Sequence, residues 1–103
     1  MSGEVRGFFE QAVMLAVIRL GARATGANVL AELCGRLERK ITSGAAHITL
    51  QRLEGKGFVT SVACPRVPGE GGRARRRYAI TASGEKALDS ARDRIERAWS
   101  PGE

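Results

Sequence analysis

The chain of 103 residues has few of the residue types on which metal sites, disulfide frameworks and most catalytic sites depend. It contains two cysteines, one histidine and only 5% aromatic residues. Cys34 and Cys64 are not part of a CxxC pair, so we expect them to be reduced, small, buried side chains rather than a redox pair. One histidine without paired acids beside it provides neither an ordinary zinc site nor a catalytic acid–base pair. We therefore expect no metal, no cofactor and no enzymatic activity.

Long apolar runs and a signal peptide are also missing. No apolar stretch approaches the roughly 20 residues that a membrane-spanning helix needs. The first residues, Met1 to Gly7, lack the charged start, apolar run and small-residue cleavage site of a secretory signal. We expect a cytoplasmic protein without a membrane partner, and the length suits a single domain with one modest core.

The chain has an excess of positive charge, and this excess is concentrated in one segment. Lys and Arg outnumber Asp and Glu by 17 to 11, a formal net charge of +6. Between Val59 and Arg77 there are five arginines and one acid, Glu70. Such a cluster is typical of a surface that binds a polyanion, although a solvated charge run has the same composition.

Apolar residues recur at helical spacing in four segments. These segments are Phe8–Leu20, a second from about Ala24 to Leu37, a third from Thr42 or Ser43 to Gly57, and a fourth from Thr81 to about Trp99. The first has apolar residues on more than half of its circumference, so it needs more than one packing partner. The fourth carries a narrower stripe of Leu88, Ala91, Ile95 and Ala98 or Trp99.

The register of the third helix follows from its apolar residues. Ala46, Leu50 and Leu53 lie at i, i+4 and i+7 and form one core-facing stripe. The opposite face carries Gly44, His47, Ile48 and Gln51. We expect this second face to meet a partner, and Ile48 could pack on a thymine methyl or add to the core.

Two strands are predicted after the third helix. Residues 58–64 and 75–81 are rich in Val, Thr, Phe, Tyr and Ile, and the loop between them, 65–73, contains two prolines and three glycines. The order helix, strand, arginine-rich strand is that of a winged helix-turn-helix, a mainly α fold with a small β-hairpin wing. We expect one domain over 1–103, with a winged-helix core at 8–81 that includes an extra N-terminal helix, and a C-terminal dimerisation helix at 82–99.

Several motifs in this order resemble the PadR family of bacterial transcriptional regulators, particularly its short members. The motifs are Glu10-Gln-Ala-Val-Met-Leu-Ala-Val, Gly26, the run from Gly44 to Leu53-Glu-Gly-Lys-Gly-Phe-Val, Gly71-Gly-Arg-Ala-Arg-Arg, and Tyr78-Ala-Ile-Thr-Ala-Ser-Gly84. The chain departs from the family pattern at His47, where tyrosine is usual, at Arg77-Tyr78, where two aromatics are frequent, and at Ala82, where proline is usual. These departures concern the preferred DNA sequence more than DNA binding itself.

The resemblance implies a homodimer in which the last helix of each subunit packs on the first helix of the other. Such a dimer binds an inverted repeat in double-stranded DNA, usually represses, and in some members responds to a small apolar or aromatic effector. The predicted dimer residues are Phe8, Phe9, Ala12, Leu15, Leu88, Ala91, Ile95 and Trp99. Residues that could line an effector site are Phe8, Phe9, Met14 and Trp99, for which simple dimer packing is the alternative.

The predicted DNA-binding residues come from the third helix and the wing. They are Thr42, Ser43, His47, Ile48, Gln51, Arg52, Lys56, Arg73, Arg75, Arg76, Arg77 and Tyr78. In the helix, a cap or a hydrated surface residue is the alternative for each polar side chain, and Arg52 could instead pair with Glu32. Tyr78 is expected to pack beneath the wing first and to contact a phosphate second.

Two other functions fit the same features. A winged helix can serve as a protein-interaction adaptor, and a basic domain can coat DNA without sequence preference. RNA binding is less consistent with the sequence, because the few aromatic residues fall mostly in helices rather than on an exposed sheet.

Overall fold

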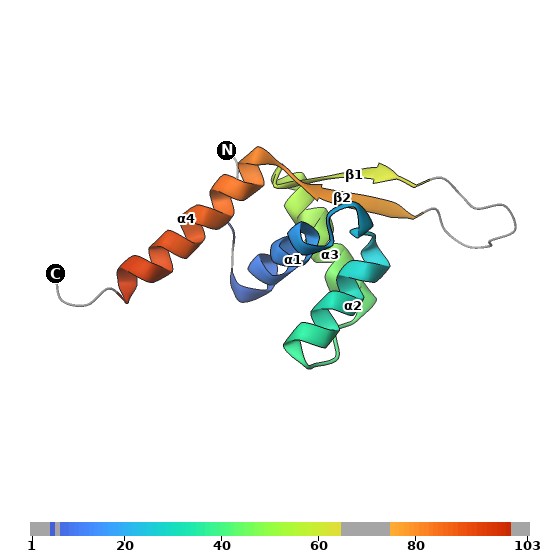
Figure 1. Cartoon of the computed structure of the whole chain (residues 1–103), viewed down its shortest axis with the longest axis horizontal. Coiled ribbons are helices and arrows are strands. Elements are labelled where there is room, and N and C mark those ends of the chain that lie inside the picture. The colour runs from blue at the N-terminus through green and yellow to red at the C-terminus, as the bar shows by residue number, and fades with distance from the viewer. Residues whose placement is uncertain (1–4, 6, 65–74, 100–103) are drawn as a thin grey trace, which may run out of the picture.

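The computed structural model describes residue 5, residues 7–64 and residues 75–99. In chain order the elements are α1 (Gly7–Leu20), a short 3-10 turn (Gly21–Arg23), α2 (Gly26–Leu37), α3 (Ser43–Gly55), β1 (Val59–Ala63), β2 (Arg76–Ile80) and α4 (Ala82–Ala98). Figure 1 shows α1, α2 and α3 packed together, with the β-hairpin and α4 extending to opposite sides of them. This is the predicted winged helix-turn-helix with an added helix at each end.

The core lies between the first three helices and the hairpin. Its largest fully buried side chains are Val13, Met14, Val17, Val29, Leu50, Leu53, Phe58 and Val59. Val13 and Val17 of α1, Val29 and the buried Leu33 of α2, and Leu50 and Leu53 of α3 lie at three-and-four spacing, as the periodicity predicted. Burial of so many aliphatic side chains, at about 1.5–3 kcal/mol each, is the main force that holds α3 against the body.

Residues at or next to its two ends determine where α3 begins and ends. At its start, the Thr42 hydroxyl accepts a hydrogen bond of 3.0 Å from the Ala45 amide, which is the N-cap expected there. At its end, Gly57 takes φ +80°, a left-handed conformation that suits glycine, and the Phe58 amide then donates to the Leu53 carbonyl at 2.9 Å. The chain thus turns directly from α3 into β1.

The hairpin is a two-stranded antiparallel sheet in which Ser61 pairs with Tyr78 and Val62 pairs with Arg77. One face packs on the core, where Val59 and Tyr78 are buried. The Tyr78 amide also donates to the Ala24 carbonyl at 2.9 Å, so β2 is joined to the segment that begins α2. The base of the hairpin is therefore fixed to two helices.

The start of α4 is held tightly against the end of α3. Thr81 caps the helix by accepting from the Gly84 amide at 2.9 Å, and its hydroxyl donates to the Gly57 carbonyl at 2.6 Å. A Cβ on Gly84 would lie 2.1 Å from the Phe58 carbonyl oxygen, so only glycine fits here. The last residue of the Tyr-x-Ile-Thr-x-x-Gly motif is thus required by a close backbone contact.

Some features differ from expectation or were not expected. Cys34 and Cys64 are half-buried rather than buried. Glu32 pairs with Arg19 and Arg36, and not with Arg52. The predicted wing loop at 65–73 lies outside the described residues. Over the part of the chain that the structure covers, no helix is long and apolar enough to cross a bilayer, and no group of three metal-ligating side chains is found.

Candidate nucleic-acid interface

The outward face of α3 has the register that the sequence predicted. Ser43, His47 and Gln51 are exposed along it, and 54% of the Ile48 surface is accessible. Thr42 is also exposed, although its hydroxyl already serves as the N-cap of α3. The face is therefore polar and small at its start, with one exposed aliphatic side chain that the core does not use.

Two adjoining hollows lie between this face, the start of α2 and β2. The first, of about 430 Å³, is lined by Ser43, and the second, of about 530 Å³, by Asn28 and Arg76. Both are also lined by Gly26, Ala27, His47 and Arg75, and we call these four residues with their hollows the interface groove. Three elements that are distant in sequence thus converge on one concave surface.

The contribution of α2 to this groove was missed by the sequence reasoning. Thr25 caps α2 by accepting from the Asn28 amide at 3.2 Å, and the Asn28 side chain donates to the Arg23 carbonyl at 2.8 Å. The amides at a helix start carry partial positive charge and favour an anion. Gly26 and Ala27 therefore belong with the candidate phosphate-binding residues, whereas the amide and the side chain of Asn28 are already bonded to Thr25 and Arg23. The signal was present in Thr25-Gly26, a capping residue followed by a small one.

The arginines of the wing lie in different environments. Arg75, Arg76 and Arg77 are all exposed, whereas Arg73 lies outside the described residues. Arg76 and Arg77 point to opposite faces of β2, since side chains alternate along a strand. Arg76 donates from Nε to the Ser61 Oγ at 3.0 Å, so its guanidinium is held against the neighbouring strand.

Arg52, in the last turn of α3, and Lys56, the C-cap of that helix, also lie in different environments. Arg52 is exposed, as a phosphate contact requires. Lys56 instead faces the body of the protein, where its Nζ lies 2.9 and 3.1 Å from the two carboxylate oxygens of Glu10. The Lys56 side chain is 16% exposed and that of Glu10 is 5% exposed. In this arrangement Lys56 joins α3 to α1 and does not line the interface groove.

Tyr78 also has a structural position. Only 4% of its surface is accessible, which agrees with packing beneath the wing. Burial raises the pKa of the Tyr78 phenol above its ordinary value, and the nearby Glu54 carboxylate raises it further, while Arg76 opposes this shift. The hydroxyl therefore remains neutral at physiological pH and lies close to both charged groups.

The predicted dimer residues divide into exposed and buried groups. Phe8, Leu15, Ile95 and Trp99 are exposed, Trp99 by 83%, and Phe9 and Ala12 are half-buried. Leu88 and Ala91 are buried within the chain itself, so in this conformation they form no surface that a second subunit could touch. Met14, predicted for an effector site, is fully buried in the core and lines no surface groove.

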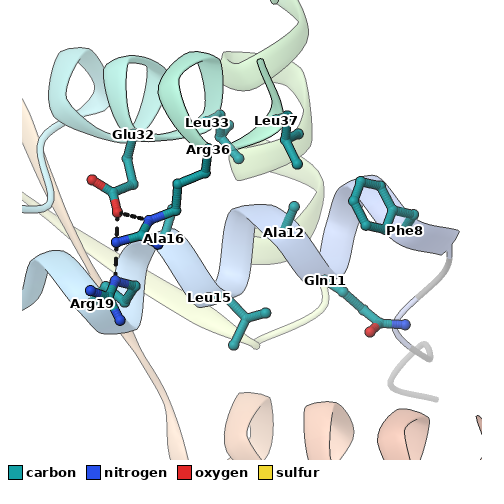
Figure 2. A pocket seen from close by; sticks show the side chains of 10 residues that line it. All are labelled: Phe8, Gln11, Ala12, Leu15, Ala16, Arg19, Glu32, Leu33, Arg36 and Leu37. Atoms are coloured by element: carbon teal, nitrogen blue, oxygen red, sulfur yellow. Dashed lines mark hydrogen bonds and ion pairs between the residues drawn. The ribbon is translucent and has the colours of Figure 1, made fainter. Parts of the chain in front are cut away.

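An apolar groove of about 190 Å³ runs between α1 and α2 (Figure 2). Phe8 lies at one end, and Leu15, Leu33 and Leu37 lie along the groove. At the other end Arg19 and Arg36 both contact Glu32, as the dashed lines in Figure 2 show. The hydrogen bond from Arg36 lowers the pKa of Glu32, so the Glu32 carboxylate at this end of the groove stays ionised at neutral pH. Of the four predicted effector residues, Phe8 is the one in this groove.

Solved structures with the same fold include transcription factors. A PadR-like transcription factor from Bacteroides fragilis has a TM-score of 0.71 with this chain at 19% identity, over 87% of this chain and 82% of its own. The complex structure of hsRosR-S1 gives 0.70 at 18% identity, over 94% and 79%. A candidate transcriptional regulator from Thermoplasma acidophilum gives 0.61 at 21% identity, over 89% and 93%.

Neither a protein-family model nor a curated protein matches the chain. At identities of 18–21% the likeness to solved structures concerns the fold alone. The fold is that of PadR-like transcription factors, as the motifs of the sequence predicted.

Proposed function

We propose that this protein is a DNA-binding transcriptional regulator of the PadR type. The observation that carries the proposal is the interface groove, in which the exposed face of α3, the start of α2, and Arg75 and Arg76 where β2 begins converge. A helix with a basic hairpin beside it can place one element in the major groove and the other along the phosphates. The neighbours with the same fold support this reading at the level of architecture.

Within this proposal the residues have different roles. Gln51 and His47, exposed on α3, would contact base edges, and Ile48 would pack on a thymine methyl. Arg52 and Arg77 would contact phosphates, and the start of α2 would hold a further phosphate through its amides. Phosphate contacts give affinity and the helix gives sequence preference, so the two sets should respond differently to mutation.

We also propose that the protein acts as a homodimer on an inverted repeat and represses by occupying a promoter. Two exposed apolar surfaces support this proposal. One is the α1–α2 groove, which Phe8 and Leu15 line, and the other is the outer half of α4, where Ile95 and Trp99 are exposed. The α4 stripe of one subunit would fill the groove of the other. Such a two-fold dimer would separate the two α3 helices by about 34 Å, one turn of DNA.

A small apolar effector would act in the α1–α2 groove. A ligand that enters beside Phe8 would compete with the partner helix and change the angle between the two winged domains. Repression would then be relieved without any change in the DNA-contacting residues.

The dimer is tested by sedimentation of Leu15→Glu, with Val62→Glu as its matched control. Both residues are exposed and aliphatic, but Val62 lies on the hairpin and outside the α1–α2 groove. We expect Leu15→Glu to sediment as a folded monomer and Val62→Glu to remain dimeric. A monomeric wild type, or a dimer that tolerates Leu15→Glu, would remove the groove from the interface.

DNA binding is tested by fluorescence anisotropy with duplex and single-stranded oligonucleotides at several salt concentrations. The proposal predicts a clear preference for duplex and an affinity that falls steeply with salt. Equal binding of both forms, or an affinity that is independent of salt, would favour a protein-interaction adaptor instead.

A further inference from the structure

Three side chains from three different elements form a hydrogen-bonded chain at the base of the wing. Arg76 on β2 donates from Nε to the Ser61 Oγ on β1 at 3.0 Å. Ser61 donates its one hydroxyl proton to the Glu54 Oε2 on α3 at 2.8 Å. Each bond has one charged partner, which makes it stronger and more directional than a bond between neutral groups. We call these three residues the wing relay.

The wing relay connects the hairpin to the end of α3. It joins both strands to α3 near the last turn of that helix, beyond the point where the Phe58 amide bonds the Leu53 carbonyl. Tyr78, the partner of Ser61 across the sheet, packs on the core beside it. The relay thus connects both strands to α3 at a point nearer the tip of the hairpin than the bond between Phe58 and Leu53.

Because side chains alternate along a strand, Arg76 and Arg77 lie on opposite sides of β2. Arg76 lies on the same side of the strand as the buried Tyr78 and is engaged by Ser61, whereas Arg77 lies on the opposite, solvent-facing side. The bond through Nε restricts where the Arg76 guanidinium can point, although its four Nη hydrogens remain available as donors. Among the described residues, no hydrogen bond restricts the Arg77 guanidinium in this way.

We propose that Arg76 is a positioning residue that holds the wing at a set angle to α3 through Ser61 and Glu54, and that Arg77 makes the phosphate contact. This inference rests on the proposed DNA-binding function. It replaces the view of the wing arginines as equivalent contacts. A loosened wing can still bind phosphates by itself, but wing and helix no longer fit the duplex together, so preference for the operator falls more than general affinity.

The test compares Ser61→Ala and Arg76→Ala with two neighbours, Thr60→Ala and Arg77→Ala. Thr60→Ala removes a hydroxyl from the exposed side of the same strand, and Arg77→Ala removes the adjacent arginine. Affinity is measured for the selected duplex and for a scrambled duplex over a range of salt. The wing relay predicts that Ser61→Ala lowers the ratio of these affinities by about two- to tenfold without changing the salt slope.

The double variant separates the two explanations further. Ser61→Ala combined with Arg76→Ala should lower the affinity ratio no more than Arg76→Ala alone, because both remove the same connection. Arg77→Ala should weaken binding to both duplexes and reduce the salt slope by about 0.9. The inference is overturned if Arg76→Ala reduces the slope as Arg77→Ala does, or if Ser61→Ala behaves like Thr60→Ala.

A measurement without DNA keeps failure of the wing relay distinct from failure of the proposed function. In the free protein, the Nε–H of Arg76 should exchange slowly with water by NMR and should lose this protection in Ser61→Ala but not in Thr60→Ala. Protection in a protein that shows no duplex preference would support the relay and reject the DNA-binding function. An unprotected Nε–H in a protein with normal duplex preference would reject the relay alone.

Discussion

Replacing Lys56 by alanine should destabilise the protein severely, although the residue was expected to be a surface contact. Lys56 is the C-cap of α3, and its ammonium bonds the carboxylate of Glu10, whose side chain is only 5% exposed. Removing one partner of a buried ion pair typically costs about 3–5 kcal/mol. Because the Lys56 side chain keeps 16% exposure, water can reach the site, and we expect a cost near the lower end, about 3 kcal/mol.

This cost should be visible in both thermal and chemical unfolding. For a domain of this size each kcal/mol lowers the Tm by about 4–8 °C, so a loss of about 3 kcal/mol should make Lys56→Ala melt roughly 12–24 °C below the wild type. The assay is urea unfolding followed by circular dichroism at one protein concentration, since a dimer would make the midpoint depend on concentration.

The control for this prediction is Arg52→Ala. It removes the same charge from the same helix, but from an exposed site, and should change the unfolding free energy by no more than about 0.5 kcal/mol. The double change Glu10→Leu with Lys56→Met should recover most of the loss, because an apolar pair needs no neutralisation. A Lys56→Ala protein as stable as wild type, with a reduced salt slope for DNA, would refute the reasoning and return Lys56 to the interface.

Three further predictions concern other parts of the molecule. Gly84→Ala should lower the unfolding free energy by about 1–3 kcal/mol or more, because its Cβ would lie 2.1 Å from the Phe58 carbonyl oxygen; a neutral effect in urea unfolding would contradict that contact. Burial raises the pKa of Tyr78, so the stability it contributes is complete below the unfolded pKa near 10.0 and is lost as pH rises through the folded value. Urea midpoints measured from pH 8 to 11 should therefore fall more steeply for wild type than for Tyr78→Phe, and parallel curves would oppose this. Gln51→Ala should cost about 1–3 kcal/mol on the preferred duplex and little on a scrambled one, and an equal loss on both would make Gln51 a phosphate contact.

The architecture was predictable because its signals are local. Ala46, Leu50 and Leu53 repeat at helical spacing, so the buried face of α3 and its outward face both follow from the order of residues in the chain. The N-cap at Thr42 and the left-handed Gly57 depend on residues within one turn of the helix ends. Such features depend on few neighbours, and the sequence shows all of them.

The details that the sequence did not show depend on contacts between distant segments. Glu10 and Lys56 are 46 residues apart, and nothing in either local pattern indicates that they meet. The periodicity of α4 gave one continuous stripe, but it could not show that the body of the protein covers Leu88 and Ala91 and leaves Ile95 exposed. An apolar stripe in the sequence shows which face of a helix is apolar, but it does not show which element covers that face.

In the candidate site, too, the local features were predictable from the sequence and the contacts between distant segments were not. The outward residues of α3 follow from register alone, whereas the contribution of α2 follows from how β2 is fixed to the start of that helix. The hydrogen bond from the Tyr78 amide to the Ala24 carbonyl brings the wing beside Gly26 and Ala27. The helix-start signal Thr25-Gly26 marks the beginning of α2 but does not show that the wing lies beside it. Arg76 and Arg77 are identical in sequence terms and differ only in the side of the strand that each occupies.

The most direct test of the central claim is selection from a random pool of duplex DNA, with sequencing of the bound fraction at two salt concentrations. A dimeric regulator predicts one enriched inverted repeat, with half-sites about one DNA turn apart, and weaker recovery at the higher salt concentration. Salt-sensitive binding without any enriched sequence would contradict sequence-specific regulation and indicate a protein that coats DNA. No recovery at either salt concentration would contradict DNA binding itself.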